Sequence, residues 1–185
     1  MEEVPVRDVP GPARQIPNAL TLLRFAAIPL FVWLLLQDRE GPSWWAGIVF
    51  ALAAITDQID GFLARRWHVE SAFGKVADPL ADRLMIDTAV VLLVVLDRLP
   101  WVALVILLRD VVLVGGYKLV APRGFELEVS MLGKVATWGL YASICLVLVT
   151  REGTWWPLAL FWISLGLAVV AAAGYVLRAR RELRD

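Results

Sequence analysis

Six apolar stretches, each near the length of a membrane-crossing helix, constrain this chain more than any other feature. A helix needs about 20 mainly apolar residues to cross the hydrocarbon core of a bilayer. Because backbone groups in lipid must satisfy their own hydrogen bonds, and because these stretches lack polar and apolar alternation, they predict helices rather than a β-barrel. The stretches cover 19–37, 44–64, 79–97, 100–119, 132–150 and 155–177.

Composition excludes two other classes of protein. Hydrophobic residues make up 59% of the chain and charged residues 19%, whereas soluble domains average about half apolar and a quarter charged. The 18 basic residues are balanced by 18 acidic residues, so no bulk positive charge is available for nucleic acid. We therefore expect an all-α, integral membrane protein with six transmembrane helices and no nucleic-acid partner.

We expect three segments along the chain. Residues 18–178 form the six-helix domain, and residues 179–185 form a basic C-terminal tail. Residues 1–17 contain four prolines and no long apolar core, which favours an N-terminal cytoplasmic or interfacial arm over a helix or a cleavable signal peptide.

The basic residues predict the orientation in the cell membrane, because cytoplasmic segments of membrane proteins are enriched in Lys and Arg. With a cytoplasmic N-terminus, the outer connections hold only Arg39, Arg98 and Arg151. Tryptophans begin three of the stretches on the predicted outer interface, where aromatic side chains gather. The inner segments carry Arg7, Arg14, Arg65, Arg66, Lys75, Lys118, Arg123, Arg178, Arg180, Arg181 and Arg184. Both termini are thus predicted to be cytoplasmic in a multi-pass protein.

Four aspartates lie where a membrane helix normally excludes charge. A carboxylate inside the membrane costs roughly 3 kcal/mol unless a partner, water or a cation offsets it. Asp57 and Asp60 are three residues apart, and Asp78 and Asp82 are four apart, so each pair shares one helix face. A short connection between the two helices brings the pairs together. A set of carboxylate ligands suits Mg²⁺ or Mn²⁺, and two such ions about 4 Å apart support phosphoryl transfer.

The same segment carries a longer motif. It reads Asp57-x-x-Asp60-Gly61-x-x-Ala64-Arg65, then eight residues, then Gly74-x-x-x-Asp78-x-x-x-Asp82. This motif resembles the complete signature of the CDP-alcohol phosphatidyltransferase family. The resemblance implies that the four aspartates hold two divalent metal ions, that Asp82 is the general base, that CDP-diacylglycerol is the donor with CMP released, and that the chain forms a homodimer among membrane lipids.

The resemblance also implies a nucleotide pocket beside the metals, at a cytoplasmic active site. Arg65 would contact phosphate, and Ser71 stands where the family often places a small hydroxyl residue. The residues implied to line the pocket are Gly61, Ala64, Arg65, Ser71 and Gly74.

The first stretch begins with Asn18, Thr21 and Arg24, which resemble an N-x-L-T-x-x-R pattern of family members that make phosphatidylglycerol phosphate or cardiolipin. This resemblance implies an acceptor site. In the alternative interpretation, Asn18 caps the helix and Arg24 extends to the membrane surface.

Two further cations belong to the predicted acceptor site. Arg109 lies in the middle of an apolar stretch and requires a carboxylate, a phosphate or a water-filled cavity; the neighbouring Asp110 is a partial partner. Lys134 opens the fifth stretch, where membrane anchoring is the alternative role. Together, Arg24, Arg109 and Lys134 are predicted to form an anion site for an acceptor that bears a phosphate. Glycerol 3-phosphate and phosphatidylglycerol both satisfy this requirement; an Arg-Asp pair resembles the cardiolipin-forming branch.

Two neighbouring titratable residues are predicted to stand outside the metal site. Asp87 lies five residues after Asp82, which turns it away from that helix face, so we expect it to pair with a basic neighbour such as Arg83. His68, between the two halves of the motif, is interpreted as a solvated loop residue.

The leading hypothesis is a membrane phosphatidyltransferase that acts on glycerol 3-phosphate, with cardiolipin synthesis from phosphatidylglycerol as the alternative. A small cation transporter, in which the aspartates bind the transported ion, is the non-enzyme alternative. Transporters interrupt their helices near the midplane, whereas the four aspartates here are predicted at one membrane face.

Overall fold

The computed structural model describes residues 16–38, 41–67, 74–120 and 130–182, and every regular element in these ranges is helical. Within them, the side chains of 16–18, 20, 21, 57–67, 74–82, 114–120 and 179–182 lie outside the description. The all-α prediction is therefore confirmed for the described residues. The elements are α1 (Ile16–Gln37), α2 (Trp44–Trp67), α3 (Gly74–Val95), η2 (Trp101–Leu104), α4 (Val105–Val120), α5 (Met131–Val149) and α6 (Trp155–Glu182).

Each predicted stretch corresponds to one of these helices, with differences at the ends. The fourth stretch begins as the 3₁₀ helix η2, preceded by Pro100 in an extended conformation, and becomes α-helical only at Val105. Helix α6 continues to Glu182, into the segment predicted as a tail. The final basic residues thus extend the last helix, because Arg is a good helix former.

By length and composition, two of the described helical segments are long and apolar enough to cross a membrane. They are Met131–Val149 and Trp155–Arg178. Two shorter apolar segments, Leu22–Gln37 and Trp44–Thr56, belong to α1 and α2. Helix α2 becomes charged beyond Thr56, and α3 begins with charged residues. The charged motif therefore shortens the apolar part of the helices that carry it.

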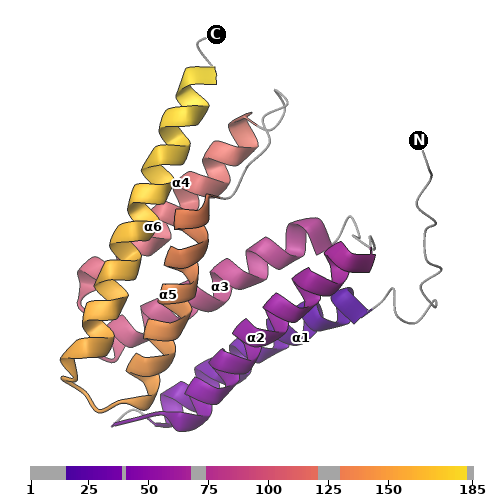
Figure 1. The fold of residues 1–185 in the computed structure, drawn as a ribbon. Helices are drawn as coiled ribbons and strands as arrows, with labels where there is room; N and C mark the ends of the chain where they lie inside the picture. Colours follow the sequence, from indigo (N-terminus) through magenta and orange to yellow (C-terminus); the bar gives the residue numbers. More distant parts are fainter. Residues whose placement is uncertain (1–15, 39–40, 68–73, 121–129, 183–185) are drawn as a thin grey trace.

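The helices pack as two groups joined through α2 and α5 (Figure 1). Helix α1 contacts α2 and α3, while α5 and α6 form an antiparallel hairpin whose second helix also contacts α4. Aromatic rings link the groups: the ring centroids of Phe31 and Phe50 are 5.7 Å apart, and those of Phe50 and Tyr141 are 5.6 Å apart. The core therefore runs continuously from α1 to α5.

Two glycines allow close helix packing. A Cβ atom at Gly47 of α2 would lie 2.6 Å from Cγ1 of Val149 on α5. A Cβ atom at Gly139 of α5 would overlap Oγ of Ser164 on α6. Small residues at such crossings let helix backbones approach closely, so these positions fix the α2–α5 and α5–α6 contacts.

Arg98 joins the connections that follow α1, α3 and α5. Its Nη1 donates to the carbonyl oxygen of Gly41 at 3.4 Å, and its Nη2 donates to the carbonyl oxygens of Thr150, at 2.9 Å, and Val147. The backbone N–H of Ser43 donates to the Leu148 carbonyl oxygen at 2.8 Å. Burial lowers the pKa of the Arg98 guanidinium from its ordinary value. The three connections therefore form one bonded layer at one end of the bundle.

We expect Arg98→Met to destabilise the protein, because it leaves carbonyl oxygens at the ends of α1 and α5 without their donor. Each unsatisfied buried polar group costs about 1–3 kcal/mol. Thermal unfolding in detergent should show a lower Tm for this variant, and no change for Arg151→Met, which alters an exposed arginine of the same region. Equal Tm values for the two variants would contradict this role of Arg98.

Candidate functional site

The sequence motif lies at the end of the bundle opposite the Arg98 layer. Helix α2 starts beside that layer and ends at Trp67, and α3 starts at Gly74 and returns to it. Asp57 and Asp60 thus fall in the C-terminal part of α2, and Asp78 and Asp82 in the N-terminal part of α3. These two helix ends approach each other in Figure 1. The four side chains lie outside the described residues, so their convergence stays a prediction.

The nucleotide-pocket residues occupy the same region. Gly61, Ala64 and Arg65 belong to α2, and Gly74 is the first residue of α3. Ser71 and His68 fall in 68–73, outside the described residues. Among the described residues, no three His, Cys, Asp or Glu side chains form a metal-binding group. The motif aspartates are not among those side chains, and their all-oxygen donor chemistry fits hard divalent cations.

Arg24 is buried on the helix that packs against both motif helices. Its side chain is 2% exposed, and α1 contacts α2 and α3. An arginine that extends to the membrane surface keeps its guanidinium in water, which does not fit this burial. Asn18 and Thr21 lie on the first turns of α1, and their side chains are outside the described residues.

A cluster of ionised side chains joins α3 to α4. Nη1 of Arg83 lies 2.7 Å from Oδ1 of Asp110, and Nη1 of Arg109 lies 2.6 Å from the same oxygen. The side chain of Asp110 is 7% exposed, that of Arg109 15% and that of Arg83 30%. Charge pairs buried in this way need close geometry to offset their lost hydration. Asp110 is therefore a partner of two arginines from two helices.

Arg83 forms its ion pair with Asp110, and the described contacts contain no direct ion pair between Arg83 and Asp87. Asp87 lies against the cluster, close to the carboxyl of Asp110 and within electrostatic range of Arg83 and Arg109. Sequence reasoning missed the pair because its residues are 27 positions apart. The signal available in the sequence was Arg83 itself, a charge inside an apolar stretch.

Lys134 lies apart from this cluster. It is exposed in the first turn of α5, where the backbone N–H of Gly133 donates to Oγ of the N-cap residue Ser130 at 3.1 Å. Within the described residues, α4 contacts α6 and not α5. The structure thus joins Arg109 with Arg83 and does not bring Lys134 to them.

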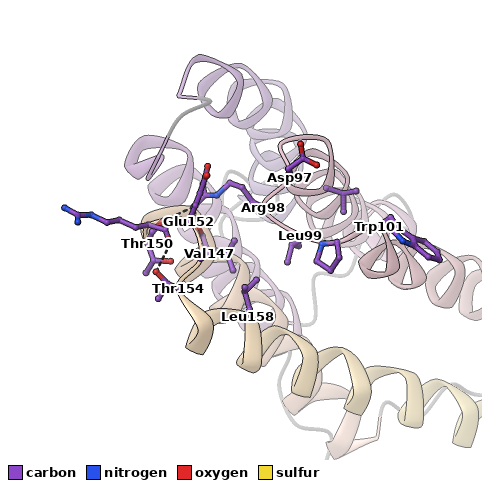
Figure 2. A pocket seen from close by; sticks show the side chains of 13 residues that line it. Asp97, Arg98, Leu99, Trp101, Val147, Thr150, Glu152, Thr154 and Leu158 are labelled. Carbon is purple, nitrogen blue, oxygen red and sulfur yellow. Dashed lines mark hydrogen bonds between the residues drawn. The ribbon is translucent and has the colours of Figure 1, made fainter.

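A cavity of about 520 Å³ lies at the opposite end of the molecule, in the Arg98 layer (Figure 2). Its walls include Asp97 of the turn after α3, Trp101 of η2, the connection between α5 and α6, and Leu158 of α6. No motif residue lines it. Because the Nη atoms of Arg98 are already bonded to carbonyl oxygens, this cavity presents no assembled catalytic group.

Comparison with known proteins agrees with the motif. Residues 14–171 match the family model of the CDP-alcohol phosphatidyltransferases. The chain is similar to a protein of Streptomyces coelicolor named cardiolipin synthase (CMP-forming), with 36% identity over 91% of this chain and 84% of that protein. Proteins named CDP-diacylglycerol–glycerol-3-phosphate 3-phosphatidyltransferase are also similar. That of Bacillus subtilis is 33% identical over 86% of this chain and 92% of its own length. That of Escherichia coli is 32% identical over 92% of this chain and 97% of its own length.

Proposed function

This chain belongs to the CDP-alcohol phosphatidyltransferase family, and from that membership we propose that it transfers a phosphatidyl group from CDP-diacylglycerol to glycerol 3-phosphate, with release of CMP. The observation that carries the proposal is the complete motif from Asp57 to Asp82 on two consecutive helices. Relatives named for this reaction match nearly the whole chain. The product is phosphatidylglycerol phosphate, so the chain acts in phospholipid biosynthesis.

The acceptor has a second candidate. The Streptomyces coelicolor relative is named cardiolipin synthase, which supports phosphatidylglycerol as the alternative acceptor. Both acceptors present a hydroxyl group together with a phosphate. Arg24 and Arg109, with Asn18 and Thr21, are proposed to belong to the site that binds the acceptor.

We place the protein in the cell membrane with six transmembrane helices and with the motif at the cytoplasmic face. The motif ends of α2 and α3 point away from the Arg98 layer. Trp44, Trp101 and Trp155 begin helices beside that layer and are exposed, as expected of an aromatic belt. CDP-bearing lipid and a cytosolic acceptor meet at the other end.

The reaction requires a proton acceptor, a nucleophile and a leaving group. Asp82 takes the proton of the acceptor hydroxyl, since a carboxylate can act as a general base at neutral pH. The hydroxyl oxygen then forms a bond to the phosphatidyl phosphorus, and the bond from that phosphorus to the CMP oxygen breaks. Arg65 binds phosphate oxygens of the nucleotide, while Gly61, Ala64, Ser71 and Gly74 line its pocket.

The four aspartates Asp57, Asp60, Asp78 and Asp82 are proposed to hold two divalent cations, Mg²⁺ or Mn²⁺. When bound, such ions neutralise charge on the pyrophosphate and on the departing CMP. Without them, these carboxylates on two adjacent helix ends repel one another.

Asp82→Asn should abolish most CMP release, because an amide does not accept the hydroxyl proton. General base catalysis contributes about 10²–10⁴-fold to a rate, and a loss in that range is expected in an assay of purified protein with CDP-diacylglycerol and Mg²⁺. Asp97→Asn is the matched control, since Asp97 is exposed at the opposite end. Near-normal turnover by Asp82→Asn would contradict the assignment of the base.

The acceptor is identified by measuring CMP release with glycerol 3-phosphate or with phosphatidylglycerol. We expect release with glycerol 3-phosphate and little release with phosphatidylglycerol. The reverse result would establish cardiolipin synthesis instead. Absence of CMP release with both acceptors would leave the family assignment in place and would point to a different acceptor alcohol.

A further inference from the structure

We propose that Asp110 is a positioning residue that holds Arg83 and Arg109 together as one anion-binding pair, and that this pair binds the phosphate of the acceptor. The inference rests on the proposed function. It adds Arg83 and Asp110 to the acceptor site, and it names the substrate class as an alcohol that carries a phosphate.

The geometry of the cluster carries the argument. Both Nη1 atoms donate to the same oxygen, Oδ1 of Asp110, at 2.7 Å from Arg83 and 2.6 Å from Arg109. A guanidinium has five N–H donors, so one shared oxygen uses only a small part of the capacity of the two arginines. Nε of Arg109 is buried and has no hydrogen-bond partner in the described part of the chain. The pair therefore retains donors for a second anion.

The charges of the cluster favour the same assignment. Two guanidinium groups bound to one oxygen repel each other, and the Asp110 carboxylate offsets that repulsion. Asp87 lies beside Asp110 and hydrogen-bonds to its carboxyl group, so it contacts the cluster through Asp110, and the described hydrogen bonds of the two arginines go to Asp110. Asp110 is the least exposed member and Arg83 the most exposed. The carboxylate thus supports the cations from the interior of the bundle.

The position of Arg83 links the pair to the reaction. Arg83 directly follows Asp82 on α3, the residue proposed to take the proton of the acceptor hydroxyl. Arg109 comes from the neighbouring helix α4. Consecutive helix residues point in different directions, so one acceptor molecule would place its phosphate at Arg83 and its hydroxyl group at Asp82 with different parts of its length, and fixed placement of reactants lowers the barrier to reaction.

The test separates positioning from simple charge. Asp110→Asn removes one negative charge beside the arginines and weakens the hydrogen bonds that align them. If alignment matters, we expect the acceptor KM to rise about ten-fold, with the KM for CDP-diacylglycerol unchanged. Asp110→Glu should restore part of the loss. If Asp110 acts only through its charge, Asp110→Asn should lower the acceptor KM, which would overturn the inference.

Asp97→Asn is the matched control, because it makes the same substitution at an exposed aspartate at the opposite end of the bundle. We expect it to leave the acceptor KM unchanged. Arg83→Gln should raise the acceptor KM as Asp110→Asn does, and the double variant should be little worse than either single variant, since residues that act as a unit are not additive.

Stability and function are distinguished within the same series. A merely structural ion pair predicts a lower Tm and an apparent kcat that falls in proportion to the folded fraction, with both KM values unchanged, and that outcome overturns the inference. If Asp110→Asn does not fold, the Arg83→Gln variant carries the test, since the side chain of Arg83 is the most exposed of the three.

Assays with glycerol 3-phosphate and with phosphatidylglycerol identify the source of the phosphate. Wild-type protein that releases CMP with neither acceptor refutes the proposed function, whereas active protein with unshifted KM values refutes this inference alone.

Discussion

Charge inside an apolar bundle must be paired, and this constraint organises the molecule. Asp110, which is 7% exposed, binds Arg83 and Arg109 through one oxygen, and without such partners these side chains would cost several kcal/mol inside a membrane. The pairing ties α3, which carries two motif aspartates, to α4. A polar network of this kind restricts how the two helices can be placed relative to each other. The helix that carries the proposed base is therefore held by charge as well as by apolar contacts.

The two ends of the bundle carry different kinds of residues. At one end, Arg98 bonds to carbonyl oxygens of two other connections, and the backbone of Ser43 bonds to that of Leu148. At the other end, the sequence concentrates the aspartates, arginines and glycines of the family motif. The bonded layer and the motif therefore lie at opposite ends of α2 and α3.

The sequence predicted the helical fold well because apolar length is a local property. The stretch 132–150 corresponds to α5 and the stretch 44–64 to α2, with differences of a few residues at the ends. It missed the 3₁₀ start of the fourth helix and the extension of α6 to Glu182, since helix ends depend on local backbone geometry. The motif itself was readable because its aspartates are close together along the chain.

Contacts between distant residues could be decided only by the tertiary structure. The sequence by itself determined the helices, the family and the residues of the motif, because spacing along one or two helices carries that information. It identified Arg109 as a charge in need of a partner and named Asp110 as a partial one. The crossing of the helices decides three further facts. Asp110 also binds Arg83, the side chain of Arg24 is buried, and Lys134 belongs to a helix that does not contact α4. Helix crossing depends on side-chain packing at positions such as Gly47 and Gly139, which a pattern of apolar residues does not specify.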